Sequence, residues 1–255
     1  MIRAFDHQRR APGLGFWRTL WWDACRFQCQ VAYTLLWDLR VEGAQHIPHE
    51  GPAIVVANHQ SFLDPPAHGI ALRDRPFRPL ARASLFRTRI GGAWLRSVGV
   101  IPLKDEGGDA AAMREALDAL RLGRIVLIYP EGSRSEDGAM MPFEAGVSLI
   151  VRRAKVPVVP AAIEGAFDAF PRGRSIPRPG RLAVRFGPAI SAAEATAMFR
   201  DARGGLAELH RRVDALRLQC RDDLRRRSGG LLPRAGPGDG AYEGPRVREA
   251  QGAQP

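Results

Sequence analysis

The stretch "AIVVANHQSFLDPP", residues 53–66, decides the fold because an apolar run ends directly in a polar segment. An uninterrupted run of small and β-branched residues is typical of a strand that is buried on both faces of a sheet. Similar runs follow in residues 98–104, 124–132, 156–163 and 181–187. Segments with helical spacing separate some of them. We therefore predict an α/β fold with a mixed, mostly parallel central sheet flanked by helices.

Helical spacing predicts three of the flanking segments. In residues 111–122 apolar side chains recur on one helical face, and Gly123 follows as a C-terminal breaker. Further helices are predicted for residues 192–203 and 206–227. The remaining residues, 229–255, are rich in Gly, Pro and charge without periodicity, and we predict a disordered tail there. Residues 41–228 then form the α/β domain.

Residues 1–40 are predicted to form an amphipathic N-terminal arm. Apolar side chains recur there at helical spacing, at Trp17, Leu20, Trp21, Ala24, Val31 and Leu35. Trp22 and Trp37 lie in the same arm, and tryptophan near arginine is typical of a bilayer interface. The arm either contacts a membrane or packs on its own domain.

The net charge of +11 and the pI near 10.9 indicate an anionic partner. Nucleic acid is disfavoured because the chain has no zinc finger, aromatic RNP pattern or recognition helix. Arginines alternate with apolar residues between positions 73 and 96, a mixture that suits anionic lipid headgroups but also a solvated basic face. They are Arg73, Arg75, Arg78, Arg82, Arg87, Arg89 and Arg96.

Cysteines and apolar runs exclude several classes. Cys25, Cys29 and Cys220 form no C-x-x-C pair, so neither a disulfide framework nor a zinc site is indicated. No run reaches the roughly 18 to 20 continuous apolar residues of a membrane-spanning helix. The first residues also lack the pattern of a secretory signal, and we expect a soluble or peripherally bound protein.

Asn58 and His59 follow the first predicted strand, at the sheet edge where α/β proteins usually build sites. If residues 61–64 begin a helix or turn, Asp64 can hold one ring nitrogen of His59 and support the imidazolium. Such a pair is a general base for a hydroxyl group or water. The hydroxyl is that of Ser61, as in a serine hydrolase, or that of a bound substrate. A histidine that only satisfies local backbone groups gives the same spacing.

A second polar segment, "YPEGSRS" in residues 129–135, follows the predicted strand "RIVLI". Gly132 allows a ligand to approach the backbone, and Ser133 beside Arg134 supplies donors suited to phosphate. An ordinary turn with a local salt bridge is the alternative.

Together these segments resemble the glycerolipid acyltransferase family, which is PlsC-like and typified by 1-acylglycerol-3-phosphate acyltransferase. Residues 58–64 match the pattern "NHxxxxD", and residues 129–135 look like "FPEGTRS". Residues 156–160 match the strand "VPIVPV" of the family. The resemblance covers roughly residues 36–190.

The resemblance implies an O-acyltransferase that moves a fatty acyl chain from acyl-CoA or acyl-carrier protein to the hydroxyl of a lysophospholipid-like acceptor. It implies that His59 is the general base and Asp64 its orienting carboxylate. The substrate-binding positions that it implies are Asn58, Lys104, Glu131, Gly132, Ser133, Arg134 and Pro157.

The resemblance also implies a phospholipid membrane surface as partner, a peripheral location on the cytoplasmic side of the cell membrane, and no metal or tightly bound cofactor. Two alternatives stay open: a catalytically silent lipid-binding protein of the same fold, and a thioesterase that uses water as acceptor.

One block departs from the family pattern "G-x-I-P-V-x-R". This chain has Lys104 followed by Asp105, so an acid stands where the family has arginine. Glu144 likewise stands where the family often has lysine. Both changes make the acceptor site less cationic and favour a different lysolipid, or another amphipathic alcohol or amine.

Overall fold

The apolar runs of the sequence form the centre of one seven-stranded sheet, which confirms the predicted α/β class. The computed structural model describes residues 10–72, 75–103 and 110–248. The strand order is β1-β8-β7-β2-β5-β3-β4, and all neighbours are parallel except β7 and β8. The strands of the sheet are β1 (Arg40–Glu42), β2 (Ala53–Ala57), β3 (Phe77–Arg82), β4 (Ile101–Leu103), β5 (Ile125–Ile128), β7 (Val158–Glu164) and β8 (Ala183–Phe186).

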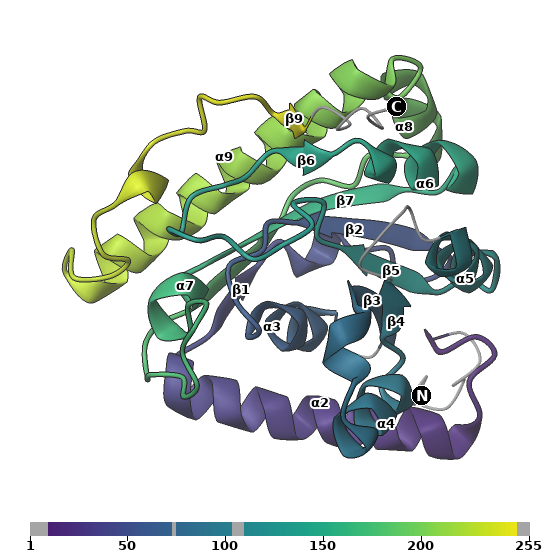
Figure 1. Ribbon diagram of the computed structural model, residues 1–255, viewed down its shortest axis with the longest axis horizontal. Helices are drawn as coiled ribbons and strands as arrows, with labels where there is room; N and C mark the ends of the chain where they lie inside the picture. The colour runs from purple at the N-terminus through teal and green to yellow at the C-terminus, as the bar shows by residue number, and fades with distance from the viewer. Residues whose placement is uncertain (1–9, 73–74, 104–109, 249–255) are drawn as a thin grey trace.

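Helices cover both faces of this sheet (Figure 1). Side chains of β2 alternate between the faces, because successive residues of a strand point in opposite directions. Ile54 and Val56 pack in the core under α5, α6, α8 and α9, whereas Val55 and Ala57 pack with α2 and α3. The helices are α2 (Phe16–Trp37), α3 (Asp64–Ala71), α4 (Arg89–Ser97), α5 (Ala110–Arg121), α6 (Gly146–Ala154), α7 (Ala166–Ala169), α8 (Ala192–Met198) and α9 (Ala202–Ser228), with short 3-10 turns η1 (Ala44–His46), η2 (Ala83–Phe86) and η3 (Pro237–Asp239).

The predicted elements are found with two differences at their ends. The predicted helix 192–203 ends earlier, at Met198, and α9 begins at Ala202 instead of residue 206. The cause is Asp201, whose carboxylate accepts hydrogen bonds from the backbone of Arg203 and Gly204 and so caps a new helix. Strand β3 was not predicted, because Pro79 and flanking arginines obscure its apolar pattern.

Residues 229–248 differ from the predicted disordered tail. Arg217 of α9 donates to the backbone oxygen of Gly238 at 2.6 Å, and Arg221 donates to the Asp239 carboxylate at 2.9 Å. Strand β9 (Val247–Arg248) pairs with β6 (Phe143–Glu144) in a separate two-stranded sheet. Hydrogen bonds from arginine side chains hold this segment, so it needs no apolar periodicity.

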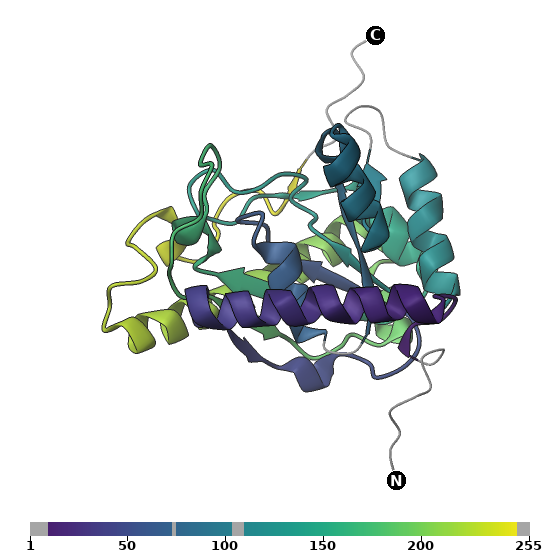
Figure 2. The ribbon, with the colours of Figure 1, turned by 90° about the horizontal axis from the view of Figure 1, so that it is seen from below.

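Helix α2 lies along the outside of the domain (Figure 2). It carries apolar side chains both on its buried side and on its exposed side. Trp22 and Trp37 are buried against the domain, which corrects their predicted place at a bilayer interface. Trp37 also donates its indole N–H to the backbone oxygen of Arg178 at 2.7 Å. The opposite side exposes the large apolar side chains of Phe16, Trp17, Leu20, Trp21, Phe27, Val31, Leu35 and Leu36. Within the described ranges, no helix combines the length and apolar character needed to cross a bilayer.

Candidate active site

His59 and Asp64 meet at the carboxyl end of β2, as the sequence predicts. Nδ1 of His59 lies 2.7 Å from Oδ2 of Asp64, which is fully buried at the first position of α3. The same oxygen accepts the backbone N–H groups of Gln60 at 2.6 Å and Ser61 at 2.8 Å. A carboxylate that accepts from Nδ1 leaves the proton there, so Nε2 of His59 is the basic nitrogen.

The loop between β5 and β6 holds the backbone of His59 from both sides. Glu131 accepts the His59 N–H at 2.8 Å, and Ser135 donates its N–H to the His59 oxygen at 2.7 Å. The second Glu131 oxygen accepts the N–H of Met141 at 3.0 Å. Burial raises the pKa of Glu131 well above its ordinary value. The side chain that was predicted to bind substrate is thus directed at the histidine backbone instead.

The ring of His59 stacks on Tyr129, with centroids 4.2 Å apart and an angle of 17° between the planes. The Tyr129 hydroxyl lies 3.2 Å from Nδ1 of His68, a fully buried histidine on α3. Nδ1 of His68 also lies 2.8 Å from the backbone oxygen of Asp64. Burial lowers the pKa of His68, so the neutral ring is favoured. Tyr129 and His68 therefore fix the plane in which His59 lies.

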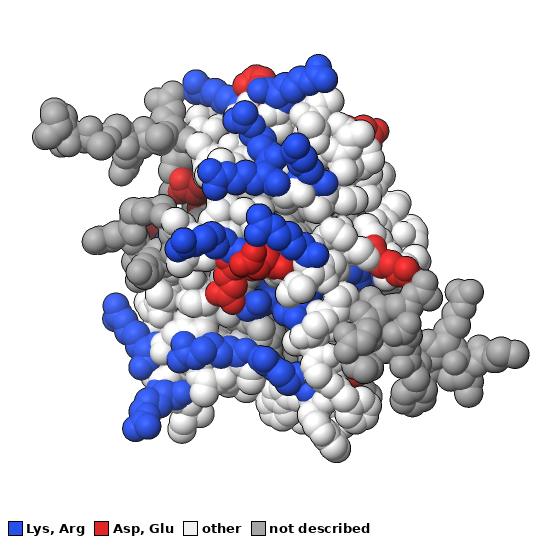
Figure 3. All heavy atoms as spheres, turned by 90° about the vertical axis from the view of Figure 1, so that its right-hand side faces the viewer, with Lys and Arg blue, Asp and Glu red and all other residues white. Residues whose placement is uncertain are grey.

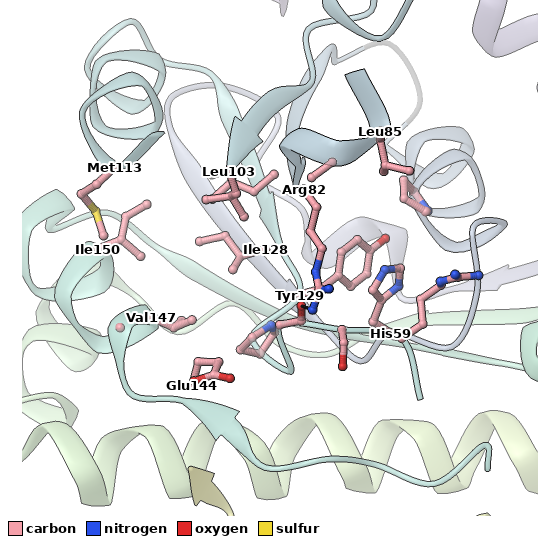
Figure 4. A pocket seen from close by; sticks show the side chains of 18 of the residues that line it. His59, Arg82, Leu85, Leu103, Met113, Ile128, Tyr129, Glu144, Val147 and Ile150 are labelled. Atoms are coloured by element: carbon pink, nitrogen blue, oxygen red, sulfur yellow. Dashed lines mark hydrogen bonds between the residues drawn. The ribbon is translucent and has the colours of Figure 1, made fainter. Parts of the chain in front are cut away.

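A cavity of about 750 Å³ opens beside His59. Figure 4 shows His59, Tyr129 and the end of Arg82 at one end of it, and Met113 and Ile150 at the other. The part between them is lined mostly by apolar side chains, Leu80, Leu103, Ile128 and Val147. Glu144, Arg114 and Arg153 also line the cavity, so a carboxylate stands among its arginines. Near His59 the walls are basic, with Arg134 and Arg172. The cavity thus joins the pair of His59 and Asp64, a group of arginines and a mostly apolar channel.

Gly132, Ser133 and Arg134 of the predicted binding residues line this cavity. Gly132 has a φ of +70°, a conformation that favours glycine, and its oxygen accepts from Arg82 at 3.0 Å. The Arg134 guanidinium lies 3.7 Å from the centre of the Phe62 ring. These three residues are near the base, as predicted.

Other predicted binding residues lie elsewhere. Asn58 is buried, and its amide exchanges hydrogen bonds with the backbone of Ile163 at 3.0 and 2.9 Å, which ties β2 to β7. Pro157 precedes β7 and lies at the opposite edge of the sheet from His59, because β2 and β7 run parallel. Lys104, with Asp105, falls outside the described residues.

The geometry disfavours Ser61 as a nucleophile. Ser61 is fully buried, its hydroxyl donates to the backbone oxygen of Phe170 at 2.8 Å, and it accepts the Leu63 N–H at 3.2 Å. Both hydrogen bonds hold the loop that carries His59. Within the described residues, no group of three or more His, Cys, Asp or Glu side chains is arranged to hold a metal ion.

Sequence reasoning missed Arg82, Gln60 and His68 as parts of the site. Arg82 ends the strand whose pattern Pro79 obscures, and Gln60 is an ordinary polar residue next to the histidine. The spacing in the sequence could have indicated His68, because it lies four residues after Asp64, one helical turn away on the same face.

At the carboxyl end of the sheet, a histidine held by a buried carboxylate therefore lies beside a long and mostly apolar cavity. Comparison with known proteins agrees. Residues 38–164 match the family model described as Acyltransferase. The chain is similar to the chloroplastic 1-acyl-sn-glycerol-3-phosphate acyltransferase LPAT1 of Arabidopsis thaliana, with 29% identity over 67% of this chain and 48% of that protein.

Mammalian and bacterial proteins match as well. The mouse 1-acyl-sn-glycerol-3-phosphate acyltransferase alpha is 34% identical over 61% of this chain and 56% of its own length. The crystal structure of the 1-acyl-sn-glycerophosphate acyltransferase PlsC from Thermotoga maritima has the same fold, with a TM-score of 0.62, 24% identity and coverage of 86% of this chain and 82% of that one. The chain spans about half the length of the plant and mammalian relatives it matches. It belongs to the PlsC-like acyltransferase family.

Proposed function

We propose that this chain transfers a fatty acyl group from a thioester, acyl-CoA or acyl-carrier protein, to a hydroxyl of a 1-acylglycerol-3-phosphate-type acceptor. The observation that supports this most directly is the 2.7 Å contact between Nδ1 of His59 and Oδ2 of Asp64 beside the apolar cavity. The curated relatives described above carry the name of this activity.

In the proposed reaction, Nε2 of His59 takes the proton of the acceptor hydroxyl as its oxygen attacks the thioester carbonyl. Asp64 stabilises the imidazolium, because a buried carboxylate beside Nδ1 favours the charged ring. The tetrahedral intermediate then expels the thiolate, which receives the proton from Nε2. The products are the new ester and a free thiol, so atoms and charge balance without an acyl-enzyme.

The apolar channel suits the fatty acyl chain. Most of its wall is made of Leu, Ile, Val and Met side chains, and each buried methylene is worth about 0.8 kcal/mol. Met113 and Ile150 close the end that lies farthest from His59 in Figure 4. We therefore assign chain-length selection to these two residues.

The basic mouth suits a phosphate on the acceptor. Arg82, at the end of β3, and Arg134, on the loop that also carries Gly132 and Ser133, both line the cavity with His59. Guanidinium groups bind phosphate in a bidentate manner, and burial near other arginines lowers the pKa of Arg134, as expected where cations gather. Arg82 supplies positive charge although Asp105 stands where the family has arginine. The arginines at this end of the cavity support a phosphate-bearing acceptor over another amphipathic alcohol or amine, which the sequence alone also allows.

Membrane contact is the second part of the proposal. The exposed side of α2 presents Trp17, Leu20 and Leu35, and α4 exposes Ile90 and Trp94. Apolar side chains with tryptophan and arginine are typical of helices that lie in a bilayer interface. Of the arginines between residues 73 and 96 that the sequence associates with lipid headgroups, Arg75 does not take part: it is buried and donates to three backbone oxygens. We propose a peripheral protein on the cytoplasmic side of the membrane.

The test measures thiol release from palmitoyl-CoA and palmitoyl-carrier protein, with and without a panel of lysolipids, for the wild type and His59→Ala. Release that needs both an acceptor and His59 supports the transferase. Release without an acceptor would instead indicate a thioesterase, and no release with vesicle binding retained would indicate a silent lipid-binding protein.

A further inference from the structure

A second cavity, of about 310 Å³, lies at the amino ends of the strands, on the opposite side of the sheet from the carboxyl ends where His59 lies. Its lining comes from the start of β3, the segments before β4 and β5, the beginning of α2 and α5. This edge forms the right-hand side of Figure 1, the face that Figure 3 presents, where Lys and Arg side chains predominate. The cavity shares no lining residue with the catalytic one.

Three arginines and one carboxylate line this cavity: Arg18, Arg78, Arg124 and Glu115. Arg78 is fixed by an ion pair with Glu115 and by a 2.8 Å hydrogen bond to the backbone oxygen of Gly99. Within the described part of the chain, Arg124 forms a hydrogen bond only through its Nε, which donates to the oxygen of Pro12 at 2.7 Å. Arg18 makes no hydrogen bond or ion pair with any described residue. Three positive charges thus face one negative charge, and two guanidinium groups keep free donors.

The positive charges that line this cavity outnumber its one carboxylate. Burial, together with repulsion from Arg78 and Arg18, lowers the pKa of Arg124, so the folded protein disfavours this gathering of cations. A bound anion would offset that repulsion. Arginine pairs with phosphate through parallel N–H donors, and the free donors of Arg18 and Arg124 are available for it.

We propose that this cavity is a phosphate-binding site separate from the catalytic cavity. Its position favours the headgroup of an anionic phospholipid over a soluble phosphate ester. Arg18 lies on α2 between Trp17 and Trp21, whose side chains are exposed on the apolar side of that helix, and Trp21 bonds to Ser97 at the cavity wall. A bilayer that covers this side of α2 brings headgroups to the cavity. The choice of a lipid source therefore rests on the proposed membrane contact, whereas the phosphate site itself does not.

The test compares Arg18→Gln and Arg124→Gln with the matched control Arg26→Gln, which removes the same charge from α2 outside the cavity. Binding of the full chain is measured by cosedimentation with phosphatidylcholine vesicles with and without phosphatidylglycerol. We expect Arg18→Gln and Arg124→Gln to weaken binding to the phosphatidylglycerol vesicles on the order of tenfold. We expect this loss of vesicle binding to persist at high salt, where any effect of Arg26→Gln on vesicle binding is screened.

A second measurement identifies the source of the phosphate. Calorimetric titration with inorganic phosphate and with glycerol 3-phosphate reports soluble binding. If the wild type shows a saturable heat of binding that Arg124→Gln removes, and the variants bind vesicles as well as the wild type does, the phosphate site is supported with a soluble ester as its ligand. Glu115→Gln removes the competing carboxylate and is expected to tighten binding severalfold in whichever arm responds.

The phosphate site would be overturned if all three arginine variants lost vesicle binding equally, or if neither the vesicle assay nor the calorimetric titration responded to Arg18→Gln and Arg124→Gln. Should Arg124→Gln fail to fold, Arg18→Gln decides, because Arg18 has no hydrogen bond or ion pair to a described residue that the substitution could break. The membrane contact and the phosphate site are tested separately. Failure of the wild type to bind any vesicle refutes the membrane contact, while the calorimetric titration still tests the phosphate site. Neither measurement depends on turnover.

Discussion

Replacement of Asp64 by asparagine removes the charge of the proposed catalytic pair and keeps its shape. The amide oxygen can occupy the place of Oδ2, which accepts from His59, Gln60 and Ser61. The amide nitrogen then occupies the place of Oδ1, which is buried and makes no hydrogen bond in the described part of the chain. An unpaired buried amide costs about 2 kcal/mol of folding free energy, which lowers the melting temperature by roughly 4–8 °C.

The expected effect on rate is much larger. A carboxylate and an imidazolium whose charges lie about 4 Å apart attract each other by about 4 kcal/mol at an effective dielectric constant of 20. Asparagine forfeits this attraction only when the ring becomes charged, that is, in the transition state. A loss of that size corresponds to a decrease in kcat of about 10³-fold, with little change in KM.

The assay is thiol release from acyl-CoA with a saturating lysophospholipid, at 25 °C, where the variant remains folded by circular dichroism. Asp118→Asn is the matched control, because Asp118 pairs with Arg121 on the exposed side of α5. His59→Ala and the double variant complete the cycle: the double variant should be no slower than His59→Ala alone, since the two residues act as a unit. A rate for Asp64→Asn within threefold of the wild type would refute the proposed role of the carboxylate.

Four further outcomes are expected. Arg82→Gln should raise KM for a phosphate-bearing acceptor by about tenfold and leave KM for acyl-CoA unchanged, which steady-state kinetics with both substrates varied will check. Met113→Trp should shift donor preference to shorter chains, by roughly fourfold in kcat/KM per methylene that no longer fits, measured across an acyl-CoA series. Trp17→Ser should weaken cosedimentation with phosphatidylcholine vesicles by about tenfold without a change in melting temperature, since this side chain is 77% exposed. Burial lowers the pKa of His210 to about 4, so between about pH 6.5 and pH 4 the unfolded chain binds more protons than the folded one, and the wild type loses stability as the pH falls. His210→Gln should remove this contribution. Denaturant titrations should therefore show a free energy of unfolding that changes by roughly 3 kcal/mol less over this pH range in the variant than in the wild type.

Local patterns were sufficient to predict the apolar central strands and the contact between His59 and Asp64. The run at residues 53–57 is apolar throughout because β2 is buried on both faces, and this requirement is visible without coordinates. The spacing from His59 to Asp64 also predicts their contact, because both lie in one short loop and helix start.

The sequence alone could not reveal contacts between distant segments. Glu131 holds the backbone of His59 across 72 positions, and residues 229–248 are held by arginines of α9 in the absence of any apolar pattern. Hydrogen bonds of this kind leave no periodicity, since either partner alone has the composition of a loop.

By itself, therefore, the sequence determined the apolar strands, the order of the motifs and the contact between His59 and Asp64, because each depends on neighbours in the chain. Only the tertiary structure decided that Glu131 and Asn58 face inward, that Trp22 and Trp37 pack on the domain, and that Arg82 reaches the base. Those orientations depend on which segment packs on which, and packing is a property of the folded chain as a whole.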